Sequence, residues 1–120
     1  MSATVMIVDD AVFMRTILRG ILKDSGFTVV AEAASGIEAM KLLRSSQPDI
    51  ILLDIILPDA NGIDLIASLL RTHPGVKILV CSSISQDPTI RKALDYGARG
   101  FIQKPFTPEK VLEALHRLEG

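Results

Sequence analysis

The sequence predicts a doubly wound α/β domain, in which a parallel β-sheet is covered by helices on both faces. Short apolar segments typical of buried strands alternate with amphipathic helical segments along the whole chain. Five such strand–helix units follow one another without an internal repeat, a low-complexity stretch or a linker. The length of 120 residues is enough for one domain and too small for two.

Five segments have the composition of strands, and they lie at residues 4–8, 28–33, 50–53, 77–81 and 101–103. The first, third and fourth are the most continuously apolar, which is typical of strands buried on both faces. The second and fifth contain Thr28, Glu32 and Gln103, polar residues expected at the edges of a sheet. We therefore predict the strand order 2-1-3-4-5, the flavodoxin-like arrangement.

Each predicted strand is followed by a segment whose apolar residues recur at helical spacing. We expect these residues to face the core: Met14, Ile17, Leu18, Ile21 and Leu22; Met40 and Leu43; Leu65, Ile66, Leu69 and Leu70; Ile90, Ala93 and Leu94; Val111, Leu112 and Leu115. A capping box at Ser35–Glu38 begins the second helix. Asp87 and Thr107, each followed by proline, are predicted caps of the last two helices.

The composition restricts the classes of function. The net charge is −1 and both signs are interspersed, so no nucleic-acid-binding surface is predicted. The single cysteine, Cys81, excludes an internal disulfide and fits a reducing compartment. There is no recognisable signal peptide, and no apolar run approaches the roughly 20 residues that span a bilayer. We expect a cytoplasmic, monomeric protein that binds neither nucleic acid nor membrane.

Three acidic residues lie where two of the predicted central strands end. Asp9 and Asp10 follow the first strand, and Asp54 follows the third. Since the carboxyl ends of neighbouring parallel strands meet at one edge of a sheet, we expect the three carboxylates to lie together where this fold binds ligands. Carboxylates this close need a compensating cation. Mg²⁺ prefers such oxygen ligands, so the sequence predicts a magnesium site and phosphate chemistry.

Four motifs in register resemble the receiver domain of two-component response regulators. They are Val8-Asp9-Asp10, Asp54 followed by Pro58 and Gly62, Ser82 after the fourth strand, and Lys104-Pro105-Phe106. The run Asp10-Ala11-Val12-Phe13-Met14-Arg15 narrows the likeness to CheY-type single-domain chemotaxis regulators. The resemblance covers residues 1–120 and implies one receiver domain.

The resemblance implies a role for each matched residue in the predicted site. Asp54 would accept a phosphoryl group from a phosphohistidine on a CheA-like histidine kinase. Asp9, Asp10, Asp54 and the backbone carbonyl of Ile56 would hold Mg²⁺, with Asp10 a direct ligand and Asp9 acting largely through water. Lys104 would neutralise Asp54 at rest and bind a phosphoryl oxygen afterwards.

The resemblance also implies a switch between two conformations that differ by a few kcal/mol. Ser82 would donate to the phosphate, its loop would move inward, and Phe101 would fill the space that opens. A downstream protein, such as a motor-switch or adaptor protein, would bind the changed surface. The bond into Pro105 is cis in the family. The chain would be a phosphoacceptor and not an enzyme, catalysing only its own phosphorylation and dephosphorylation.

The residues leave other interpretations open. Asp9 and Asp10 could merely cap the first helix, and Lys104 could be a solvated loop residue. Phe101 could be ordinary packing. The chain could also be an isolated receiver domain of a larger transcriptional or enzymatic regulator, although only one helix is expected after Thr107. A phosphatase of the haloacid-dehalogenase type would need a second acid two residues after Asp54, where this chain has isoleucine.

Overall fold

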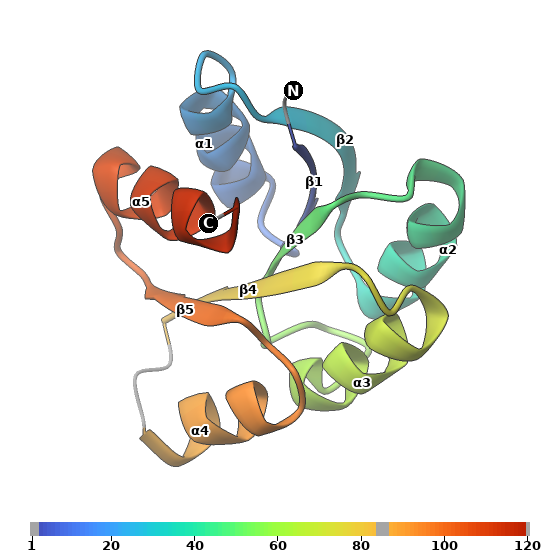
Figure 1. Cartoon of the computed structure of the whole chain (residues 1–120). Helices are drawn as coiled ribbons and strands as arrows, with labels where there is room; N and C mark the ends of the chain where they lie inside the picture. Colours follow the sequence, from blue (N-terminus) through green and yellow to red (C-terminus); the bar gives the residue numbers. More distant parts are fainter. Residues whose placement is uncertain (1–2, 84–86, 120) are drawn as a thin grey trace.

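The computed structural model describes residues 3–83 and 87–119. Within these residues, five strands and five helices alternate along the chain (Figure 1). The strands are β1 (Thr4–Val8), β2 (Thr28–Ala33), β3 (Ile50–Leu53), β4 (Lys77–Ser82) and β5 (Gly100–Gln103). The helices are α1 (Val12–Leu22), α2 (Gly36–Ser46), α3 (Gly62–Thr72), α4 (Asp87–Asp95) and α5 (Pro108–Glu119).

All strand pairs in the sheet are parallel, and the order is β2-β1-β3-β4-β5. This confirms the predicted fold class and the prediction that β2 and β5 form the edges. Ser35 is the N-cap of α2, as predicted, and its hydroxyl accepts from the Glu38 N–H at 3.1 Å. The Glu38 carboxylate accepts from the N–H of Ala34 at 2.9 Å, one residue before the cap, so the second bond of the predicted capping box differs from the expected one to Ser35.

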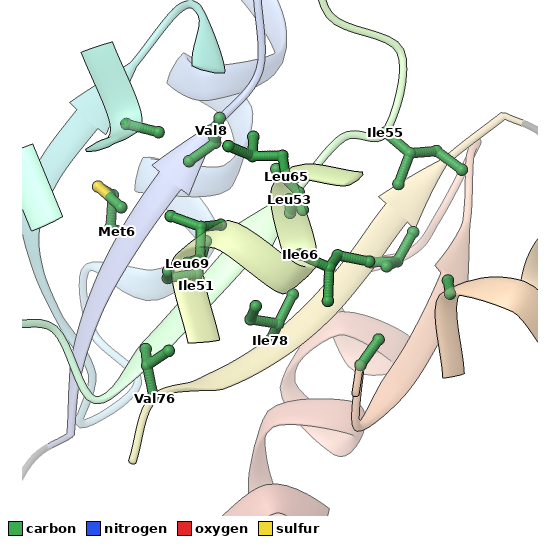
Figure 2. Close-up of a cluster of buried hydrophobic side chains, with 14 of the residues drawn as sticks. Met6, Val8, Ile51, Leu53, Ile55, Leu65, Ile66, Leu69, Val76 and Ile78 are labelled. Carbon is green, nitrogen blue, oxygen red and sulfur yellow. The ribbon is translucent and has the colours of Figure 1, made fainter. Parts of the chain in front are cut away.

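The sheet separates two hydrophobic layers because successive residues of a strand face opposite sides. Helices α1 and α5 cover one face, and α2, α3 and α4 cover the other (Figure 1). Figure 2 shows the second layer, where Met6 and Ile51 from the sheet belong to the same hydrophobic cluster as Ile66 and Leu69 of α3. Both faces of β1, β3 and β4 are therefore buried, and polar groups from these strands gather at their ends.

Helix α4 departs from its predicted packing. Ala93 is buried and Ile90 is half-buried, but Leu94 is 44% exposed, so the prediction that Leu94 faces the core is wrong. The helix follows β4 and packs against α3 beside the edge of the sheet, so only a narrow stripe of its surface is covered. The cap predicted at Asp87 depends on contacts of its side chain, which lies outside the part of the chain that the structure describes.

No helix in the described ranges is long and apolar enough to cross a membrane. Cys81 packs among apolar residues of the α1/α5 layer, as its position in a central strand predicts. Burial raises the pKa of the Cys81 thiol to about 12, against a smaller lowering by the Lys104 charge. The thiol is therefore neutral at physiological pH and acts as a packing group.

Candidate functional site

The structure brings Asp9, Asp10 and Asp54 together at the carboxyl edge of the sheet. Val8 of β1 pairs with Leu53 of β3, so the acids that follow these residues are neighbours. The Asp54 N–H donates to the Val8 carbonyl at 2.9 Å, which continues the ladder one step beyond the strands. One carboxylate oxygen from each acid lies within 4.8 Å of the other two. Three negative charges therefore share one small volume.

Lys104 places its ammonium group between two of these acids. Its Nζ lies 2.6 Å from Asp9 Oδ2 and 3.0 Å from Asp54 Oδ2. Burial alone would lower the pKa of Lys104, but the hydrogen bonds to Asp9 and then Asp54 outweigh it, so this pKa lies above its ordinary value of 10.5. Lys104 is therefore a cation at neutral pH. The sequence predicted its contact with Asp54 but not the shorter one with Asp9.

The remaining oxygens of the two buried acids accept backbone hydrogen bonds. Asp9 Oδ1 accepts from the Ala11 N–H and Asp54 Oδ1 from the Ile56 N–H, each at 2.9 Å. Each bond joins an aspartate side chain to the N–H two residues later, which forms an Asx-turn and fixes the orientation of that side chain. Asp10 differs, because it is exposed and has no hydrogen bond or ion pair with any described residue.

Neither Asp9 nor Asp10 is the N-cap residue of α1, as they would be if their role were only to cap this helix. The N-cap residue of this helix is Ala11, and it makes no side-chain capping hydrogen bond with any residue that the structure describes. Asp9 bonds to the N–H of Ala11 itself, before the helix begins. Helix capping therefore does not account for the exposed carboxylate of Asp10.

Ser82 and Phe101 lie on the two strands nearest Lys104. Ser82 is fully buried at the end of β4, and its carbonyl accepts the Lys104 N–H at 2.9 Å. Phe101 of β5 is half-buried and packs against the α2/α3/α4 layer. It also lines a cavity of about 390 Å³ beside α5. The Lys104-Pro105 peptide bond is cis, as the resemblance implied.

The segment between β3 and α3 follows Asp54 and carries Ile56. A bridge between Ile56 and Asn61 closes it. Gly62 is required there, because a Cβ at this position would lie 2.2 Å from the Cα of Ile55. Ile56 stands two residues after Asp54, at the position where a haloacid-dehalogenase-type phosphatase would need its second acid, and its apolar side chain is 53% exposed.

Asp59 anchors the same segment to α2, a contact that the sequence did not predict. Its two carboxylate oxygens accept the N–H groups of Gly36 and Ile37 at 2.8 and 3.0 Å. These bonds, that of Gly36 first, hold the pKa of Asp59 below its ordinary value of 3.8. Since the partners lie more than twenty positions apart in sequence, no local pattern could have revealed the contact.

Fold and site together define a class of protein: a doubly wound α/β domain with a pocket of three acids and one lysine at its switch point. Comparisons with known proteins agree with this class. Residues 5–116 match the family described as the response regulator receiver domain. The chain therefore belongs to the response regulator receiver family, and it is a CheY-like receiver domain, a phosphoacceptor response regulator.

Within this family, the chain is similar to proteins named as the chemotaxis protein CheY. The chemotaxis protein CheY of Listeria monocytogenes is 45% identical over 112 residues, which are 93% of this chain and 94% of that protein. CheY of Thermotoga maritima is 42% identical over 118 residues, which are 98% of each chain. Among solved structures, the CheX–CheY–BeF₃–Mg²⁺ complex of Borrelia burgdorferi superposes with a TM-score of 0.94, at 29% identity, covering 98% of this chain and 90% of that one.

Proposed function

We propose that Asp54 of this chain accepts a phosphoryl group from the phosphohistidine of a CheA-like histidine kinase, in chemotaxis signalling. One observation carries the proposal. The Lys104 ammonium contacts two buried carboxylates, Asp9 and Asp54, while the exposed carboxylate of Asp10 completes the same cluster. Membership of the receiver family and the relatives named as chemotaxis proteins support it.

The residues present fit a bound Mg²⁺. Three carboxylates and one ammonium leave two negative charges uncompensated, which a divalent cation would balance. We assign the ion to Asp9, Asp10, Asp54 and the backbone carbonyl of Ile56, an all-oxygen set of the kind that Mg²⁺ prefers. When bound, Mg²⁺ would reduce the electrostatic repulsion between the anionic nucleophile and the anionic phosphoryl group.

In the transfer step, a carboxylate oxygen of Asp54 forms a bond to phosphorus as the bond from phosphorus to the imidazole nitrogen of the kinase breaks. The imidazole leaves with the electron pair of the broken bond. Lys104 exchanges its contact with Asp54 for one with a phosphoryl oxygen, as its position 3.0 Å from Oδ2 allows. The backbone N–H of Ile56 holds the other oxygen of Asp54 and so orients the nucleophile.

The phosphorylated state is proposed to change a surface that a partner binds. Ser82 donates a hydrogen bond to the new phosphate from the end of β4, where it is buried. Phe101, which is half-buried in this structure, becomes more deeply buried as it fills the space that opens. A downstream partner protein, a motor-switch or adaptor protein, reads the change. The complex of a related CheY with CheX is consistent with protein partners of this kind.

Further features of the proposal come from the sequence. Residues 1–120 act as one cytoplasmic, monomeric receiver domain that contacts neither nucleic acid nor membrane. The chain acts as a phosphoacceptor and not as an enzyme with turnover. The phosphatase alternative is disfavoured, because its second acid would have to stand at Ile56.

Phosphorylation by a small phosphodonor tests the proposal. Wild-type protein incubated with acetyl phosphate and Mg²⁺ is expected to gain one alkali-labile phosphoryl group, located on Asp54 by peptide mass spectrometry. Asp54→Asn should gain none. Asp64→Asn is the matched control, because Asp64 is an exposed acid on α3 and its loss should leave labelling unchanged. A wild-type chain that stays unlabelled, or equal labelling of Asp54→Asn, would contradict the proposal.

A further inference from the structure

Arg15 of α1 reaches the backbone of the acidic pocket. Its Nη1 donates to the carbonyl oxygen of Asp9 at 2.6 Å, and its Nε lies 3.4 Å from Glu32 Oε1 on β2. The side chain is only 16% exposed, so these contacts are partly shielded from water. A guanidinium group can serve both partners at once because its donors form a rigid planar fork.

The carbonyl that Arg15 holds belongs to the peptide unit between Asp9 and Asp10. Since a peptide unit is planar, fixing this oxygen also fixes the direction in which the chain enters Asp10. The Asp9 carboxylate is held independently by Lys104 and by the Ala11 N–H. The Asp10 carboxylate has no partner within the described ranges, so its place in the pocket depends on the backbone.

Glu32 orients Arg15 from the neighbouring strand. It forms ion pairs with Arg15 and with Arg19, which lie one helical turn apart on the same face of α1. The residue after Glu32 also touches the pocket, because the Ala33 carbonyl accepts the Asp9 N–H at 3.0 Å. The peptide groups on both sides of Asp9 are thus held, one by β2 and one by Arg15.

We propose that Arg15, oriented by Glu32, is a positioning residue for the cation site: it holds the peptide unit that aims Asp10 at the ion. This inference rests on the proposed function, because it takes the three acids as the ion's ligands. Arg15 does not ligate the cation. Its positive charge opposes cation binding, whereas its hydrogen bond favours binding, so the two effects predict changes of opposite sign when Arg15 is replaced.

Direct titration of Mg²⁺ by calorimetry, with no phosphodonor present, separates these effects. Arg15→Met should raise the Kd for Mg²⁺ about tenfold, the lower end of the loss typical for groups that orient metal ligands. Arg19→Met is the matched control, since it also removes a cation from Glu32 but has no contact with Asp9. Its Kd should stay unchanged or fall slightly. An unchanged or lower Kd for Arg15→Met would overturn the inference.

Stability is measured in parallel by urea unfolding without Mg²⁺, because a merely structural role would lower stability and leave the Kd of the folded protein unchanged. If Arg15→Met does not fold, Arg15→Lys decides: it keeps the positive charge but loses the planar fork that serves both Asp9 and Glu32, so the Kd should rise, and an unchanged Kd would refute the role of Arg15. A wild-type chain that binds no Mg²⁺ would instead refute the proposed function.

Discussion

Acidic side chains at the two ends of the parallel sheet have opposite surroundings. At the amino end, the single carboxylate of Asp49 accepts from the N–H and hydroxyl of Thr4 at 2.8 and 3.1 Å. The Asp49 N–H donates back to the Thr4 hydroxyl at 3.0 Å. At the carboxyl end, three carboxylates lie together, and the one ammonium group of Lys104 contacts two of them, Asp9 and Asp54.

The difference shows where the chain favours stability and where it favours chemistry. Asp49 is exposed to solvent and satisfied by neutral donors, so it joins β1 to the start of β3 at little electrostatic cost. Asp9 and Asp54 are buried next to each other, and the exposed Asp10 lies close to both, so the three carboxylates repel one another. Such crowding is unfavourable for the fold alone and is useful when a cation binds.

Removal of Lys104 tests the crowded end most severely. Without Mg²⁺, Lys104→Met should lower the free energy of unfolding by about 3 kcal/mol, because two buried carboxylates lose their cation. Mg²⁺ should restore part of this loss and stabilise the variant more than wild type. Urea unfolding at neutral pH, where the raised pKa keeps wild-type Lys104 charged, measures both effects.

The exposed cation of Lys92 on α4 provides the control for this experiment. It lies 5.8 Å from the centre of the Tyr96 ring and belongs to no acid cluster of the described residues. Lys92→Met should change stability by less than about 0.5 kcal/mol. Equal losses for the two lysine variants would show that the acidic pocket does not depend on Lys104.

Asp49→Ala probes the opposite end and should have a smaller effect. The variant loses two side-chain hydrogen bonds at an exposed site, so the free energy of unfolding should fall by about 1 kcal/mol. The rate of Asp54 labelling by acetyl phosphate should not change. A slower rate with folded protein would mean that the two ends of the sheet are coupled.

Asp59→Asn should have the smallest effect, visible in the pH dependence of stability. Since the pKa of Asp59 is lowered in the folded protein, its stabilising contribution is present above pH 3.8 and is lost as the pH falls through the folded value. Wild type should therefore lose more thermal stability than Asp59→Asn when the pH is lowered from neutral to below 3.8. Parallel melting-temperature curves for the two proteins would contradict the assigned cause.

The sequence predicted the sheet well because each strand can be identified from the residues within it. Apolar runs identified the strands, and Thr28 and Gln103 identified the edges. Acids directly after buried strands predicted the carboxylate cluster, because parallel topology carries strand ends to one edge. Leu94 was placed wrongly, since helical periodicity gives a face but not the width of the surface that covers it.

The contacts that the sequence did not predict join side chains to distant backbone groups. Asp59 binds the first N–H groups of α2, and Arg15 binds the Asp9 carbonyl. Backbone partners carry no residue-specific signature, so one sequence cannot identify them. The contact between Lys104 and Asp9 escaped for a related reason: several carboxylates lie within reach of one ammonium, and only the geometry selects among them.

The central claim is that the carboxyl end of the sheet is an acidic pocket completed by one divalent cation. Calorimetric titration of Mg²⁺ into metal-free wild-type protein and into Asp10→Asn tests it most directly, because Asp10 is the exposed acid that the fold leaves without a described partner. We predict one ion per wild-type chain and at least tenfold weaker binding to the variant. No binding to wild type, or equal binding to both proteins, would contradict the claim.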